Sequence, residues 1–157
     1  MNKIIDMLED FKNLAISKKI LISTAESCTG GLISKYLTDL PGSSGFYNSS
    51  IIAYSYDSKI KLLNVNSKTL SKFGAVSEEV VKEMSLGILK ITKSTVVIAI
   101  SGIMGPGSDR EEVWISIRSK NKERSTHYPL MSGNRDMNRE YAAENAIREL
   151  YHFIKEI

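Results

Sequence analysis

The chain has 157 residues, 42% of them hydrophobic, which suits one packed core and predicts a single domain over residues 1–157. A net charge of +3, one cysteine and two histidines argue against a nucleic-acid partner, an internal disulfide and a zinc cluster. No apolar stretch is as long as a membrane span and the N-terminus has no signal-peptide core, so we expect a cytoplasmic protein with no membrane partner.

The first predicted elements alternate between helix and strand. Apolar residues at spacings of three and four predict an amphipathic helix over residues 4–17. The apolar run 20–22 begins the first strand, and a helical pattern over 30–40 follows it until a Pro-Gly pair ends it. Residues 46–54 then predict the second strand.

The middle of the chain is predicted to be helical until a buried strand. Residues 55–63 and 67–73 form two short helices, and Ser77 caps a longer one that continues to Ile91. Residues 95–100 are β-branched and almost all apolar, as expected of a central strand that is covered on both faces.

The last predicted elements are a hairpin and a helix. Residues 113–117 and 126–130 form an antiparallel pair across a basic turn, and a long helix begins near Gly133. Helices that alternate with strands, together with one late hairpin, predict an α/β fold: a three-layer α/β/α sandwich on a mixed sheet.

The octet Thr-Ala-Glu-Ser-Cys-Thr-Gly-Gly, residues 24–31, lies where the first strand gives way to a helix. N–H groups at a helix N-terminus can stabilise negative charge on a substrate oxygen. Two nucleophiles compete there, because Ser27 and Cys28 are adjacent and neighbouring residues of a strand point to opposite sides. Glu26 could complete a Glu-Lys-Cys set like that of nitrilase-like amidases, or it could orient the loop by accepting backbone hydrogen bonds.

Lys59 is a candidate base for a serine nucleophile. A lysine activates a serine only when its amine pKa is lowered towards the working pH, because the neutral amine must accept the hydroxyl proton. Ser27 and Lys59 are far apart in the chain, so their proximity depends on whether the strands before them are neighbours. The alternative is that Lys59 is an ordinary solvated helix residue.

Other candidates follow later strands. Residues 101–107 have the spacing of neither a Walker loop nor a dinucleotide fingerprint, and they form either a ligand loop or a plain turn. Arg135 could bind a carboxylate or phosphate with both arms of its guanidinium, or lie on the surface. His127 and His152 are better explained as packing or surface residues than as catalysts.

Six motifs, taken in order, resemble the C-terminal domain of the competence/damage-inducible protein CinA, a family whose stand-alone members are nicotinamide-nucleotide amidohydrolases of the PncC type. The resemblance runs from about residue 5 to the C-terminus. The motifs are Thr24-Ala-Glu-Ser-Cys-Thr-Gly-Gly31, Leu40-Pro-Gly-Ser-Ser44, Tyr54-Ser-Tyr-Asp-Ser-Lys59, Leu63-Asn-Val65, Gly74-Ala-Val-Ser77 and Ser101-Gly-Ile-Met-Gly-Pro-Gly107.

The resemblance implies hydrolysis of the carboxamide of nicotinamide mononucleotide, a small-molecule nucleotide, in pyridine-nucleotide salvage, with no metal and no cofactor. By the same resemblance Ser27 is the nucleophile and Lys59 the general base. The implied substrate-binding residues are Glu26, Thr29, Gly30, Gly31, Tyr54, Ser101, Gly105 and Arg135. A homo-oligomer is the default expectation for a small enzyme.

The sequence departs from the family pattern after Gly107. In the family the Gly-Pro-Gly loop usually continues through further Gly and Pro residues, whereas here the loop 105–112 is shorter and strongly charged. Ser101 replaces the usual threonine, and Asn134 replaces an aspartate that commonly precedes the arginine. A second hypothesis therefore stands beside the amidase: a nucleotide-binding or interaction module that has lost turnover through its shortened loop.

Overall fold

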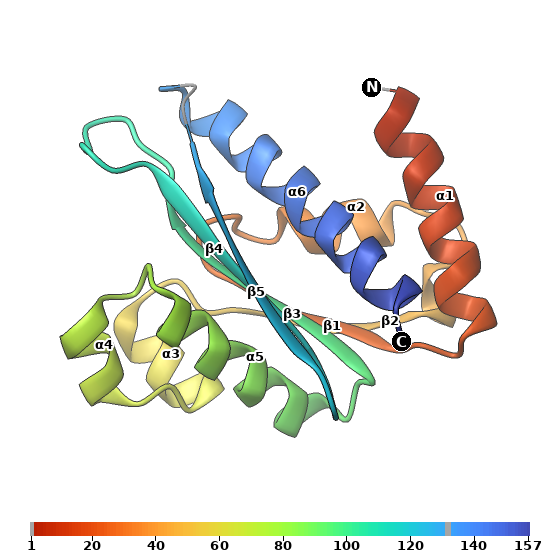
Figure 1. The fold of residues 1–157 in the computed structure, drawn as a ribbon, viewed down its shortest axis with the longest axis horizontal. Helices are drawn as coiled ribbons and strands as arrows, with labels where there is room; N and C mark the ends of the chain where they lie inside the picture. The colour runs from red at the N-terminus through yellow and green to blue at the C-terminus, as the bar shows by residue number, and fades with distance from the viewer. Residues whose placement is uncertain (1, 131–132) are drawn as a thin grey trace.

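One mixed five-stranded sheet forms the middle of the molecule in this computed structural model, which describes residues 2–130 and 133–157 (Figure 1). The strands are β1 (Ile22–Glu26), β2 (Tyr47–Ile52), β3 (Val96–Ile103), β4 (Glu112–Ser119) and β5 (Glu123–Pro129). Their order is β2-β1-β3-β4-β5; β1 is parallel to both of its neighbours, and the β3–β4 and β4–β5 pairs are antiparallel.

Helices cover both faces of this sheet (Figure 1). On one face lie α1 (Asn2–Ser17), α2 (Leu32–Thr38) and α6 (Arg135–Lys155). On the other lie α3 (Tyr56–Leu63), α4 (Ser67–Phe73) and α5 (Glu78–Thr92). A short 3-10 helix, Ser43–Gly45, precedes β2. The prediction of a three-layer sandwich on a mixed sheet is confirmed.

The sheet separates two hydrophobic cores. Successive residues of a strand point to opposite faces, so Ile98 and Ile100 of β3 pack with α1, α2 and α6, whereas Val97 and Ala99 pack with α5. Trp114 of β4 is partly buried against the core on the α5 side. Residues that follow β1 and β2 can therefore belong to different layers and still meet at the edge of the sheet.

The first strand begins later than the sequence predicts. The pattern placed its start at Ile20, but β1 runs from Ile22 to Glu26 and is buried throughout. Its polar residues are paired with hydroxyls of neighbouring segments: Ser23 Oγ lies 2.7 Å from Ser94 Oγ, and Thr24 Oγ1 donates to Ser50 Oγ at 2.7 Å. Because these bonds offset the cost of desolvation, a polar stretch can form an interior strand.

Close contact between α3 and α5 fixes the position of α3. A Cβ on Gly87 of α5 would lie 2.0 Å from the carbonyl oxygen of Leu63, so only glycine permits this approach.

The predicted cap of α5 is also present, since Ser77 accepts a hydrogen bond from the N–H of Val80 at the start of this helix. In the described ranges 2–130 and 133–157, no helix combines the length and the apolar character needed to cross a membrane.

Candidate active site

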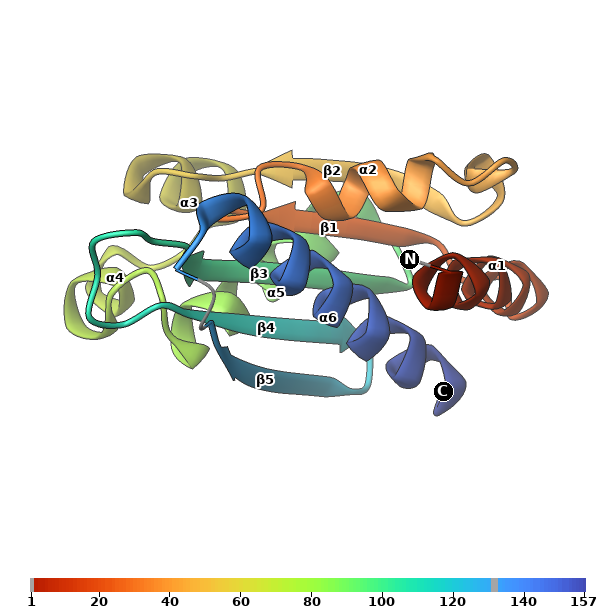
Figure 2. The same cartoon turned by 90° about the horizontal axis from the view of Figure 1, so that it is seen from above.

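The carboxyl ends of the parallel strands β1, β2 and β3 lie at one edge of the sheet (Figure 2). A cavity of about 350 Å³ opens there. Six of the residues that sequence reasoning selected line it: Ser27, Tyr54, Lys59, Ser101, Gly105 and Arg135. The loops that follow these strands therefore lie together, in accord with ligand binding at strand carboxyl ends in α/β sheets.

Lys59 extends to Ser27 from α3, on the opposite face of the sheet from the helix α2 that follows Ser27. Its Nζ lies 2.9 Å from Ser27 Oγ and equally 2.9 Å from the carbonyl oxygens of Ala53 and Tyr54. Only 1% of Lys59 is exposed, so the interpretation as a solvated helix residue is wrong. The 32-residue separation is bridged because β1 and β2 are neighbours in the sheet.

The surroundings of Lys59 increase the fraction of its neutral amine. Burial lowers the pKa of Lys59 from 10.5 to about 8, because desolvation disfavours the charged form. A neutral amine has two hydrogens and one lone pair. The carbonyl oxygens of Ala53 and Tyr54 can accept both hydrogens, which leaves the lone pair directed at the hydroxyl of Ser27.

Backbone hydrogen bonds on both sides hold the two reacting groups. The N–H of Ser27 donates to the carbonyl of Ile100 in β3 at 3.1 Å, which extends the parallel pairing beyond the end of β1. The N–H of Ala53 donates to the carbonyl of Glu26 at 2.9 Å, so the carbonyl oxygen that binds Lys59 is itself tied to β1. The serine and the amine are therefore positioned by backbone contacts with the parallel strands of the sheet.

Cys28 has the opposite electrostatic environment. Burial raises the pKa of its thiol to about 12, with the nearby Glu26 carboxylate adding to the shift. A thiol with such a pKa is not ionised near neutral pH and is a poor nucleophile. The expectation that only one of Ser27 and Cys28 faces the pocket is wrong, since both line the cavity. Strand alternation ends at this point because the N–H of Gly30 donates to the carbonyl of Ser27 and closes a turn.

Glu26 does not line the cavity, contrary to its predicted place among the substrate-binding residues. Its side chain is fully buried and turned towards α2. The carboxylate accepts hydrogen bonds from the N–H groups of Ile33 and Ser34, each at 3.0 Å, and from the hydroxyl of Thr29 at 2.7 Å. Of the two roles that the sequence left open for Glu26, the geometry gives it the second, which is to orient the turn.

The turn Thr29–Gly31 also lies outside the residues that line the cavity, although we expected it to contact substrate. Positive φ values of 60° and 102° at Gly30 and Gly31 allow the chain to reverse directly into α2. Thr29 donates its hydroxyl hydrogen to Glu26, and the N–H of Gly30 is bound to Ser27. These residues shape the turn that presents Ser27.

The first turns of α6 contact all three loops of the site. Arg135 donates from Nη1 to the carbonyl of Gly105 at 2.9 Å and from Nη2 to the hydroxyl of Tyr54 at 3.2 Å. Arg139 donates to the carbonyl of Cys28 at 3.1 Å. Asn134, which replaces the family's usual aspartate, caps the helix by accepting from the N–H of Met137. Arg135 thus begins a well-capped helix.

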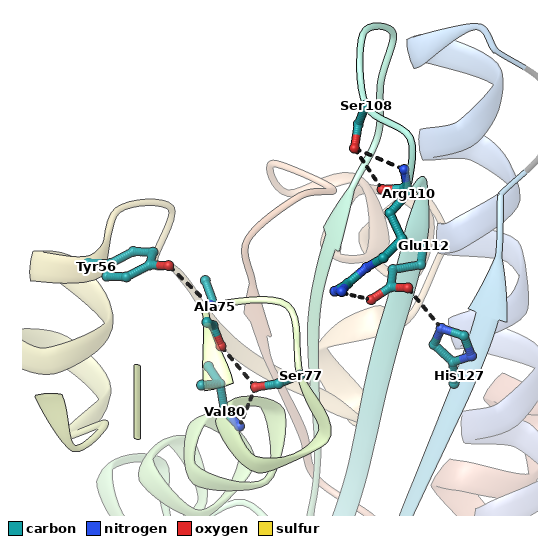
Figure 3. Close-up of polar contacts among 9 residues, drawn as sticks. Tyr56, Ala75, Ser77, Val80, Ser108, Arg110, Glu112 and His127 are labelled. Atoms are coloured by element: carbon teal, nitrogen blue, oxygen red, sulfur yellow. Dashed lines mark hydrogen bonds and ion pairs between the residues drawn. The ribbon is translucent and has the colours of Figure 1, made fainter. Parts of the chain in front are cut away.

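Sequence reasoning missed one wall of the cavity. Ala75 and Val76, which belong to the Gly74-Ala-Val-Ser77 motif, line it opposite the loop after β3. The hydroxyl of Tyr56 accepts a hydrogen bond from the N–H of Ala75 at 3.3 Å (Figure 3). The motif itself was the available signal, but small apolar residues carry no chemistry that would single them out.

The charged loop after Gly107 is bonded within itself (Figure 3). Ser108 lines the cavity and its hydroxyl accepts from the N–H of Arg110 at 3.1 Å. The guanidinium of Arg110 lies 2.7 Å from Glu112, whose carboxylate also lies 3.4 Å from His127 on β5. The ring of His127 lies against that of Trp114, tilted by 39° with 4.6 Å between centroids, in keeping with a packing role outside the cavity.

Comparison with known proteins decides the family. The sequence model described as the CinA C-terminal domain matches residues 5–154. The chain belongs to the CinA C-terminal domain family. A CinA superfamily crystal structure from Klebsiella pneumoniae 700603 has a TM-score of 0.91 with this chain and 28% sequence identity, and the match covers 97% of this chain and 98% of the other.

Two CinA relatives differ in how much of their length the chain spans. A CinA-like protein of Leptospira interrogans is 40% identical over 98% of this chain, but the match spans only 38% of that protein. The nicotinamide-nucleotide amidohydrolase PncC of Escherichia coli K12 is 38% identical over 83% of this chain and 82% of its own length. The second relative supports an enzymatic function for this member of the CinA family.

Proposed function

We propose that the protein hydrolyses the carboxamide of nicotinamide mononucleotide to nicotinic acid mononucleotide and ammonia. The observation that carries the proposal is the buried contact of 2.9 Å between Lys59 Nζ and Ser27 Oγ at the bottom of a cavity. An amine with a lowered pKa beside a serine is the arrangement that serine–lysine acyl transfer requires. The named activity of the Escherichia coli relative supplies the substrate.

The mechanism has two halves with an acyl-enzyme between them. In the first, neutral Lys59 takes the hydroxyl proton as Ser27 Oγ attacks the amide carbon, and the backbone N–H of Cys28, which lines the cavity beside Ser27, holds the oxyanion. The C–N bond then breaks and Lys59 returns the proton to the departing nitrogen, which leaves as ammonia. In the second, Lys59 takes a proton from the water that attacks the ester carbon and returns it to Ser27 Oγ as the C–O bond breaks, which releases the acid and restores Ser27.

The rest of the cavity would bind the nucleotide. Arg135 already directs two donors into this region, at Gly105 and Tyr54, and a phosphate could replace either acceptor in a charge-assisted bond. Ser101, with its side chain buried in the wall, would hold the carboxamide. We also retain as a proposal that the active form is a homo-oligomer.

Ammonia release from nicotinamide mononucleotide tests this function. We expect release by the wild-type protein and none by Ser27→Ala or Lys59→Ala, with Asp109→Ala as a control on the exposed part of the loop. Wild-type protein that binds the nucleotide but releases no ammonia would overturn the amidase.

That second outcome corresponds to the alternative function, a nucleotide-binding module without turnover. The shortened loop 105–112 is the feature that favours it. Against it, Gly105 and Ser108 of the same loop still line the cavity, so the shorter loop continues to form a wall. Measuring binding and ammonia release on the same preparation separates the two functions.

A further inference from the structure

Two side chains outside the proposed catalytic machinery join the charged loop to α6. The loop from Met104 to Glu111 forms the wall of the cavity that faces Ala75 and Val76, yet most of it projects into solvent. At the end of the loop, the carbonyl of Glu111 accepts a hydrogen bond from the N–H of Leu130 at 2.9 Å. This bond does not reach the residues between Met104 and Glu111, whose position depends on other contacts.

Glu111 folds back across the start of its own loop. A Cβ on Gly105 would lie 2.0 Å from Glu111 Oε1 and 2.5 Å from Cδ, so the carboxyl group occupies the space beside Gly105. Gly105 has a φ of 70°, which disfavours any other residue as well. The two ends of the loop are thereby in direct contact.

Asn138 of α6 joins these ends. It is 1% exposed, and its Nδ2 donates both to the carbonyl of Met104 at 2.8 Å and to Glu111 Oε2 at 2.9 Å. One turn earlier, Arg135 donates to the carbonyl of Gly105. A primary amide can supply two hydrogens from one nitrogen to two acceptors, whereas a carboxylate at the same place could supply none.

We infer that Asn138 is a positioning residue that, through Met104 and Glu111, holds the shortened loop in the shape that binds substrate. This inference rests on the proposed function for its substrate but concerns a different part of the molecule. Asn138 and Glu111 do not line the cavity, so they act through the loop and leave Ser27 and Lys59 unchanged. Their loss should therefore raise KM and leave kcat almost unaltered.

A charge exchange between the two residues tests the inference. In Asn138→Asp the new carboxylate meets Glu111 without a donor between them, and we expect the KM for nicotinamide mononucleotide to rise about tenfold at pH 8. The defect relative to wild type should shrink at lower pH, where the two carboxyl groups share a proton. Adding Glu111→Gln restores an amide–carboxylate pair, so the double variant should recover most of the KM and lose that pH dependence.

Two further variants keep the test independent of helix packing. Glu111→Ala changes only the loop and should raise KM about threefold to tenfold, whereas Asp109→Ala, an equal loss of charge at an exposed position of the same loop, should not. An unchanged KM in Glu111→Ala, or a double variant no better than Asn138→Asp, would overturn the inference.

Amide hydrogen exchange separates this inference from the proposed function. Exchange over residues 104–111 should accelerate in Asn138→Asp and in Glu111→Ala, and slow again in the double variant, whether or not nicotinamide mononucleotide is a substrate. If exchange accelerates in these variants but the wild-type protein releases no ammonia, the amidase is rejected and the positioning role is kept. If the wild type releases ammonia but exchange over residues 104–111 is equal in wild type and in all three variants, the amidase is kept and the positioning role is rejected.

Discussion

The two sides of the cavity are built differently. Ser27 and Lys59 are buried and are held beside the parallel strands β1 and β2, with the carbonyls of Ala53 and Tyr54 completing the contacts of the amine. The loop 104–111 is largely exposed and is fixed by side chains of α6. In the proposed reaction the chemistry would therefore depend on the sheet and the fit of the substrate on α6, so mutations should divide into those that change kcat and those that change KM.

The largest effect should come from the nucleophile. Ser27→Ala removes the attacking oxygen, and we expect kcat for ammonia release to fall by about 10⁴-fold or more while the nucleotide still binds. Cys28→Ala is the matched control one residue away and should change kcat by less than about threefold, because the thiol has a pKa near 12 and stays protonated. If the two variants exchange these results, the cysteine is the nucleophile.

The next effect should come from the base and should depend on pH. Lys59→Met should lower kcat by about 10³-fold. In wild type the amine works only when deprotonated, so kcat/KM should rise as the pH increases through about 8, the lowered pKa of Lys59. The residual activity of Lys59→Met should lack this rise. A wild-type profile that is flat from pH 7 to 9 would contradict the assignment of Lys59 as base.

A stability measurement sharpens the contrast between the buried turn after β1 and the exposed loop 104–111. Glu26→Gln places an amide hydrogen against the N–H groups of Ile33 or Ser34, and we expect a loss of about 2 kcal/mol in the free energy of unfolding by urea. Glu111→Gln in the loop keeps an acceptor for Asn138 and should cost less than about 0.5 kcal/mol. Equal losses would mean that the loop contributes as much to the free energy of unfolding as the buried turn after β1 does.

The smallest effect should be on substrate affinity. Arg135→Lys keeps the charge but loses the two-armed geometry that reaches Gly105 and Tyr54, so KM should rise about tenfold with kcat nearly constant. Initial-rate measurements over a range of nucleotide concentrations give both constants. A fall in kcat as large as that of Lys59→Met would place Arg135 with the reacting groups.

The order of the elements was predictable because hydrophobic spacing and caps are local signals. Residues 77–91 show this, since an N-cap, acidic first-turn residues and helical spacing all indicated the same helix, which the structure has as Glu78–Thr92. The polar part of β1 was not predictable in the same way. Its residues Ser23 and Thr24 look polar, and only the hydroxyls of other segments explain their burial.

The site was predictable as a set of types and motifs but not as a geometry. The sequence gives no local reason for Lys59 to be buried, because its carbonyl partners and its contact with Ser27 depend on β1 and β2 being neighbours. Glu26 was misplaced because a carboxylate beside a nucleophile suggests chemistry, whereas here it binds the start of α2. Asn138 lies within a helical pattern, where one polar residue gives no indication of a partner in a distant loop.

The position of Trp114 gives the molecule an intrinsic optical reporter. It is the chain's single tryptophan, and it packs against the core on the α5 side, the layer that also carries the proposed base. Ser27, by contrast, precedes α2, which lies on the other face of the sheet. If the α3–α5 layer alone loosened, the fluorescence of Trp114 would change at the same time as Lys59 moved away from Ser27. Helix α6 would still contribute its circular dichroism. In a denaturant titration, inactivation should therefore follow the emission of this indole more closely than the helical signal.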